Sequence, residues 1–107
     1  MARESNFEHA LVRRILRIYP GAIILKNDAN RLQGFPDRLI LFGKAWAAFD
    51  TKAKETAGHR PNQDYYIDLL NQMSYASFVY PQNEETFLHE LQQTLRPNRR
   101  TRLSKRE

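Results

Sequence analysis

The first apolar pattern along the chain has the period of an α-helix. Its large apolar residues recur at intervals of four, four and three positions, which places them on one helical face: Phe7, Leu11, Ile15 and Ile18. We expect the helix to begin at Ser5, because Ser5 and Glu8 have the spacing of a capping box. It ends before Pro20 and Gly21, since proline disfavours a helical residue before it and cannot continue the backbone hydrogen bonds.

Short apolar runs after this helix predict strands. Three of them follow in close succession, at Ala22–Lys26, Arg38–Phe42 and Ala45–Lys52. Gly43 and Lys44 suit a two-residue hairpin turn between the second and third strands. The polar, turn-rich residues 27–36 predict a loop before the hairpin.

The second half of the chain predicts a helix, a strand and a helix. Pro61 suits the first turn of a helix that runs to Met73, and Tyr75–Tyr80 predicts a fourth strand. We expect Asn83 to cap a last helix that ends at Leu95. The order α-β-β-β-α-β-α predicts an α/β fold, with one domain over residues 1–95. Residues 96–107 form a basic tail that we expect to be disordered.

Length and composition narrow the class of protein. A chain of 107 residues with 41% hydrophobic residues supports one core. The absence of cysteine excludes disulfides and thiolate metal sites. The apolar runs are too short to span a bilayer, and residues 1–6 lack the apolar stretch of a signal peptide. We therefore expect a soluble, cytoplasmic protein without a membrane partner.

Charge is distributed unevenly along the chain. Residues 1–60 carry a net charge of +5, residues 61–95 a net charge of −5, and the tail over 96–107 again +5. A basic half and a basic tail favour a nucleic-acid partner. The alternative is a tail that lies on the acidic half of the protein itself.

Three charged residues meet in the predicted hairpin. Asp50 and Lys52 are two positions apart on a strand, so their side chains point to the same face. Asp37 lies six residues before the Gly43-Lys44 turn and Asp50 six residues after it, which places the two carboxylates side by side. Such a pair of hard oxygen ligands suits Mg²⁺ or Mn²⁺. Lys52 could then orient a water molecule or stabilise charge on a phosphate. The alternative is a set of ordinary strand-end residues with an Asp–Lys ion pair.

These residues resemble the signature of the PD-(D/E)XK nuclease superfamily. The likeness rests on Gly34-Phe35-Pro36-Asp37, a strand and hairpin, Asp50-Thr51-Lys52 and a glutamine at the start of the next helix. The G-x-P-D form and the small size are most similar to the virus-type replication-repair nuclease domain (VRR-NUC). This resemblance implies a restriction-endonuclease-like α-β-β-β-α-β core with a mixed sheet, to which this chain adds a C-terminal helix and its tail.

The resemblance assigns roles to individual residues. Metal ligands would be the carboxylates of Asp37, Asp50 and Glu8 and the backbone carbonyl of Thr51, while Lys52 would be the catalytic lysine. Glu8 keeps its competing role in the capping box with Ser5. The family usually has glutamate where this chain has Asp50, so the metal or the strand must shift.

Other side chains are candidates for contacts around this site. The resemblance places Gln63 beside the metal, and an exposed position in the first helical turn is its alternative. Lys54 and Arg60 suit phosphate contacts, or else mark a solvated strand end and an idle loop. In the tail, the candidates for DNA binding are Arg99, Arg100 and Arg102.

The resemblance implies a Mg²⁺- or Mn²⁺-dependent DNA endonuclease that cuts branched DNA, as stand-alone phage members do in resolving Holliday junctions. That activity belongs to DNA repair and recombination, and a virus is a plausible source of the gene. A four-way junction needs two symmetric cuts, which favours a homodimer. One alternative is a nucleic-acid-binding module that keeps the nuclease fold without hydrolysis. Another is a small basic adaptor protein.

Overall fold

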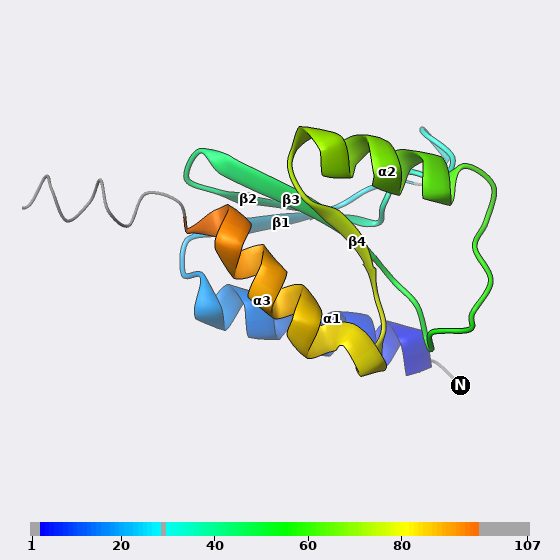
Figure 1. The fold of residues 1–107 in the computed structure, drawn as a ribbon. Helices are drawn as coiled ribbons and strands as arrows, with labels where there is room; N and C mark the ends of the chain where they lie inside the picture. The colour runs from blue at the N-terminus through cyan, green and yellow to red at the C-terminus, as the bar shows by residue number, and fades with distance from the viewer. Residues whose placement is uncertain (1–2, 29, 97–107) are drawn as a thin grey trace, which may run out of the picture.

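The chain folds around a four-stranded mixed sheet flanked by three helices (Figure 1). The computed structural model describes residues 3–28 and 30–96. Its elements follow the predicted order: α1 (Arg3–Ile18), β1 (Ile23–Lys26), β2 (Arg38–Phe42), β3 (Ala45–Thr51), α2 (Gln63–Met73), β4 (Ala76–Val79), the short 3₁₀ helix η1 (Pro81–Asn83) and α3 (Glu84–Leu95). Apart from Arg96, the predicted tail and its candidate DNA-binding arginines lie outside the described residues.

The sheet has the strand order β1-β2-β3-β4. Strands β1, β2 and β3 pair antiparallel, whereas β3 and β4 pair parallel, because the chain crosses over through α2 between them. The predicted hairpin turn is confirmed, since Phe42 lies opposite Ala45 and Gly43 adopts a φ of +61°. Glycine reaches this left-handed region without the steric cost that a Cβ brings.

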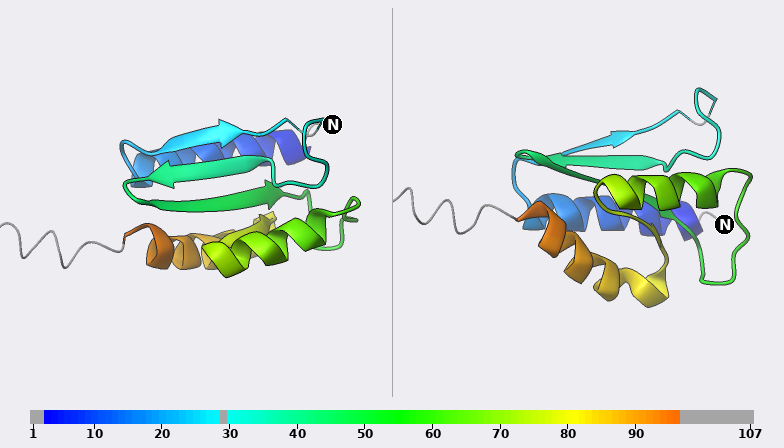
Figure 2. Two further views of the ribbon diagram at one scale, coloured as in Figure 1. Left: turned by 90° about the horizontal axis from the view of Figure 1, so that it is seen from above. Right: turned by 45° about the horizontal axis from the view of Figure 1, so that its top comes forward.

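Helices cover the two faces of the sheet and form two apolar clusters. Helices α1 and α3 share one face, where Ile15, Phe49 and Phe87 are fully buried or nearly so. Helix α2 covers part of the other face, with Ile67 and Leu70 against β3 and β4. Figures 1 and 2 show α2 on the side of the sheet opposite α1 and α3. The strands alternate between these clusters, because successive side chains of a strand point to opposite faces.

Both predicted helix caps are wrong. Ser5 lies inside α1, which begins at Arg3, so Ser5 and Glu8 form no capping box. Asn83 does precede α3, but its side chain does not cap that helix. Its Oδ1 accepts the N–H of Tyr80 at 2.8 Å, and its Nδ2 donates to the carbonyl of Phe78 at 3.1 Å. Asn83 therefore stabilises the turn that leaves β4.

Membrane insertion by a helix finds no support in the described ranges 3–28 and 30–96. None of the helices there is long and apolar enough to cross a membrane. The longest is α1, with 16 residues, and its outer face is charged.

We predict that Phe49→Ala lowers the free energy of unfolding by roughly 3–5 kcal/mol, because it leaves a cavity in the core. The Phe49 ring is fully buried and lies 5.4 Å, centroid to centroid, from the ring of Phe87. Urea denaturation followed by circular dichroism measures the change. Met73→Ala is the control, since Met73 is 66% exposed at the end of α2 and should change little. Equal effects of the two substitutions would contradict this description of the core.

Candidate functional site

The hairpin brings Asp37, Asp50 and Lys52 together as the sequence predicted. Arg38 pairs with Phe49 in the ladder, so the preceding Asp37 lies beside Asp50. The backbone N–H of Asp37 donates to Oδ1 of Asp50 at 3.1 Å. Lys52 Nζ lies 3.6 Å from Oδ2 of Asp50, which confirms that the two side chains share one face of β3. We call Asp37, Asp50, Lys52 and Gln63 the carboxylate–lysine cluster.

Gln63 connects this cluster to helix α2. Its Nε2 donates to Oδ2 of Asp50 at 3.2 Å, and its Oε1 accepts hydrogen bonds from Lys52 Nζ at 2.8 Å and from the backbone N–H of Arg60 at 2.7 Å. The residues Asp50, Lys52 and Gln63 are only 3–6% exposed. A buried charge is costly unless it is paired and hydrogen-bonded, so the amide makes the burial of the ion pair tolerable. Gln63 is buried against Asp50 and Lys52, so its exposed alternative is wrong, while its place beside a metal stays a prediction.

The carboxylate–lysine cluster has two carboxyl groups, those of Asp37 and Asp50, and a single ammonium group, that of Lys52. The pKa of Asp50 is raised from its ordinary value of 3.8 to about 6, first by burial and then by the neighbouring negative charge of Asp37. The Asp37 N–H and the charge of Lys52 act in the opposite direction without cancelling these effects. A cation between the two carboxylates would favour the charged form of Asp50.

Glu8 lies in a different ion cluster. Its Oε2 accepts from Nε of Arg38 at 2.6 Å and from Nζ of Lys26 at 3.4 Å. Burial alone would raise the pKa of Glu8, but its contacts with Arg38 and Lys26 outweigh burial and lower it. The structure does not bring Glu8 into contact with the carboxylate–lysine cluster, and its role as a metal ligand stays a prediction.

Glu4 is the acidic residue that the sequence reasoning missed. Its negative charge contributes to the raised pKa of Asp50. Glu4 lies one helical turn before Glu8, at the start of α1, so both occupy the same side of the helix. The i, i+4 spacing of the two glutamates was the available signal.

Thr51 is completely buried in β3, where it pairs with Val79 of β4. Its Oγ1 has no hydrogen-bond partner among the described residues. The predicted metal ligand is the backbone carbonyl of Thr51 rather than this hydroxyl, and that role stays a prediction.

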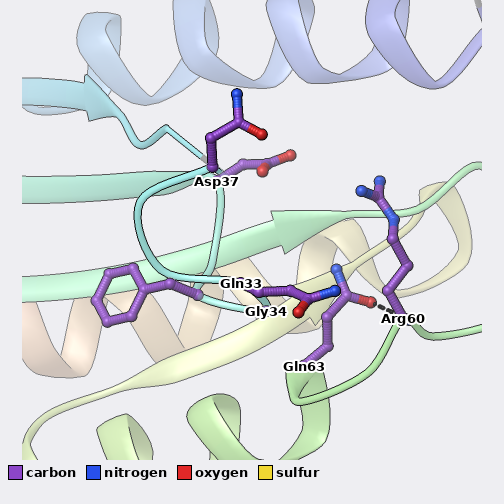
Figure 3. A pocket seen from close by; sticks show the side chains of 7 residues that line it. Gln33, Gly34, Asp37, Arg60 and Gln63 are labelled. Atoms are coloured by element: carbon purple, nitrogen blue, oxygen red, sulfur yellow. Dashed lines mark hydrogen bonds between the residues drawn. The ribbon is translucent and has the colours of Figure 1, made fainter.

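A cleft of about 350 Å³ lies next to the cluster. It runs between the loop before β2 and the start of α2, and it is lined by Asn30, Gln33, Gly34, Phe35, Asp37, Arg60 and Gln63. Figure 3 shows Gln33 and Gly34 on the loop and Arg60 and Gln63 on the opposite wall. Of the carboxylate–lysine cluster, Asp37 and Gln63 line the cleft, whereas Asp50 and Lys52 do not.

Gly34 sets the distance between the two walls of the cleft. It has a φ of +90°, and a Cβ at this position would lie 2.5 Å from the Cβ of Asn62 and 2.7 Å from the carbonyl oxygen of Pro61. The sequence singled out Gly34 as part of a motif. The structure supplies the physical reason, because only glycine permits both the backbone conformation and the close approach.

The two predicted phosphate contacts have different surroundings. Arg60 lines the cleft, whereas Lys54 is exposed on the loop that follows β3. His59 lies in the same loop, immediately before Arg60, and its ring stacks on the ring of Phe78 with the centroids 4.0 Å apart. The Nδ1 atom of His59 lies 2.8 Å from Oδ1 of Asp64. His59 therefore contributes to the packing of this loop.

The carboxylates available for a metal are few. Within residues 3–28 and 30–96, no three His, Asp or Glu side chains gather into a group that could hold a metal ion. The carboxylate–lysine cluster supplies two such side chains, Asp37 and Asp50. Mg²⁺ commonly binds proteins through one or two carboxylates and keeps several waters. The donor set therefore fits Mg²⁺ better than a metal that requires a full protein cage.

Comparison with known proteins adds no assignment, since no family model, no curated protein and no solved structure matches the chain. The function must therefore be argued from the chemistry of the site.

We predict that Gly34→Ala is more destabilising than Gly21→Ala. Gly21 has a φ of +93° and Gly34 a φ of +90°, but a Cβ at Gly21 meets no atom within 4 Å, whereas one at Gly34 overlaps Pro61 and Asn62 just before α2. The difference between the two changes in unfolding free energy therefore isolates the steric contact, which should add roughly 1–3 kcal/mol. Urea denaturation measures both. Equal losses would show that the loop does not rest on α2.

We also predict a pH dependence of stability that arises from Asp50. The unfolded chain loses this proton near pH 4 and the folded protein near pH 6, so stability falls as pH rises through this window. The loss is a few kcal/mol at most, since one unit of pKa corresponds to about 1.4 kcal/mol. In Asp50→Asn the difference in unfolding free energy between pH 4 and pH 8 should become smaller by this amount.

Asp68→Asn is the matched control for this pH dependence, because Asp68 is exposed on α2. It should leave the pH profile of the wild type in place. An Asp50→Asn profile that coincides with the wild type would show that the Asp50 carboxyl titrates normally.

Proposed function

We propose that this protein is a Mg²⁺-dependent DNA endonuclease with a restriction-endonuclease-like arrangement of its sheet and helices. The observation that carries the proposal is the carboxylate–lysine cluster. It combines two adjacent carboxylates and a lysine at the end of a hairpin, beside a cleft of about 350 Å³. Paired carboxylates can hold the ion for metal-assisted phosphodiester hydrolysis, and a lysine can stabilise the charge that develops on the phosphate.

The residues of the chain have separable roles in this proposal. Asp37 and Asp50 would hold the ion, which when bound would stabilise charge on the phosphate and acidify a bound water. Lys52 would donate a hydrogen bond to the attacking water or to a phosphate oxygen. Gln63 is a positioning residue, because its Oε1 fixes the ammonium group of Lys52 at 2.8 Å.

The distribution of charge supports DNA as the substrate. Residues 1–60, which include the whole hairpin, carry a net charge of +5, and the tail adds another +5. Arg60 lies on the wall of the cleft and Lys54 is exposed, and in this proposal both would contact phosphates that flank the scissile bond. We further propose that branched DNA is the preferred substrate and that a homodimer makes paired cuts, as the resemblance to junction resolvases implies.

One observation favours a second function, a nucleic-acid-binding module without hydrolysis. Lys52 is only 6% exposed and already donates to Gln63 while lying beside Asp50. A lysine held in this way must rearrange before it can reach a water or a phosphate. The short side chain of Asp50 also favours the binding module, because the nuclease family usually has glutamate at this position.

Cleavage of labelled DNA tests the proposal. We expect the wild type to cut linear, flap or four-way-junction substrates only when Mg²⁺ or Mn²⁺ is present. Asp37→Asn and Asp50→Asn should abolish cutting, and Lys52→Ala should slow it roughly 100- to 1,000-fold through the loss of charge stabilisation. The rates are measured on denaturing gels, with thermal melting as the check on folding.

The matched controls are Lys44→Ala in the hairpin turn and Asp68→Asn on α2, which are exposed and do not line the cleft. Both should retain the wild-type rate. Wild-type cleavage by any cluster variant would remove that residue from the site. Salt-dependent DNA binding without cleavage of any substrate would instead support the binding module.

A further inference from the structure

The cleft beside the carboxylate–lysine cluster has the dimensions of a small ligand site. Its volume of about 350 Å³ lies at the lower end of the range of roughly 300–1,000 Å³ that small-molecule sites occupy. One wall belongs to the proposed catalytic machinery, through Asp37 and Gln63. The other lining groups have no task in hydrolysis, and they include two side-chain amides, Asn30 and Gln33.

The polar groups of the cleft differ in whether they already have partners. Gln63 uses both ends of its amide inside the cluster. Asn30 and Arg60 form hydrogen bonds through their backbone N–H groups. Within the described ranges, the side chains of Asn30, Gln33 and Arg60 make no hydrogen bond to the protein. These three groups are therefore available to a ligand.

The chemistry of the available groups indicates what they would bind. A side-chain amide offers a donor and an acceptor side by side, which matches the hydrogen-bonding edge of a nucleobase. A guanidinium group matches a phosphate. Two amides and one arginine in a cleft of this volume suit one nucleotide better than they suit a metal, which would need carboxylates, or a lipid, which would need apolar walls.

We propose that the cleft receives one unpaired nucleobase of the DNA strand bound at the carboxylate–lysine cluster. Gln33 and Asn30 contact the edge of the base, and Arg60 contacts its phosphate. This inference rests on the proposed function, and it names the feature of the substrate that the site selects. A base in a continuous duplex is stacked and paired, so only an already unpaired base enters without a large cost.

Three DNA duplexes of one sequence test this inference: a fully paired duplex, one with a single bulged adenine, and one with an abasic residue in place of that adenine. We expect wild-type protein to bind and cut the adenine bulge roughly tenfold better than the abasic bulge, as expected for loss of one good base contact. Gln33→Ala and Asn30→Ala should reduce this ratio towards one, because each removes a side-chain amide from the cleft. The control is Gln72→Ala, because Gln72 is an exposed amide on α2 outside the cleft.

Binding is measured separately by fluorescence anisotropy with Ca²⁺ in place of Mg²⁺, so that the inference does not depend on hydrolysis. If the protein cleaves DNA but binds and cuts the adenine and abasic bulges equally well, the inference is overturned and the proposed nuclease stands. A base preference in binding that Gln33→Ala removes, without cleavage of any duplex, would support the inference and refute the nuclease.

If Gln33→Ala fails to fold, Gln33→Glu replaces it. Gln33→Glu keeps the shape but loses the amide donor, and an unchanged base preference in that variant would overturn the inference.

Discussion

The burial of the Asp50 carboxylate is the constraint on which the rest of the site depends. The carboxylate contacts the N–H of Asp37, the amide of Gln63 and the ammonium group of Lys52, which come from three separate segments. The three contacts form together only when β2, β3 and α2 are packed as in the fold. The polar cluster therefore fixes the end of the hairpin against the start of α2, and the cleft forms where those segments meet.

Sequence patterns predicted the elements and the central juxtaposition because both depend on local rules. The period of the apolar residues placed the helices and strands, and the two-residue turn at Gly43 fixed the register that sets Asp37 beside Asp50. Counting six residues on either side of a turn requires no knowledge of the remaining fold. The period of two along a strand was also sufficient to predict that Asp50 and Lys52 point to the same face.

The errors arose where a contact that the local residue pattern does not encode decided the outcome. The spacing of Ser5 and Glu8 fits a capping box, but Glu8 instead bonds Arg38, thirty residues away. Asn83 has the residue type of a helix cap, yet its amide serves the turn after β4. The three hydrogen bonds of the Gln63 side chain and the contact of Gly34 with Asn62 also depend on how α2 docks. No spacing along the chain encodes that docking.

The same hydrogen bonds that stabilise the cluster set a condition on its chemistry. The charged side chain of Lys52 can be buried because Gln63 accepts a hydrogen bond from its ammonium group and Asp50 pairs with its charge. In the proposed function, Asp37 and Asp50 would hold the cation. An Asp50 carboxylate shared with that cation would pair less strongly with Lys52, whose ammonium group could then donate to a phosphate. Burial and the repulsion between the two carboxylates together raise the pKa of Asp50, and a cation held by both carboxylates would relieve that repulsion.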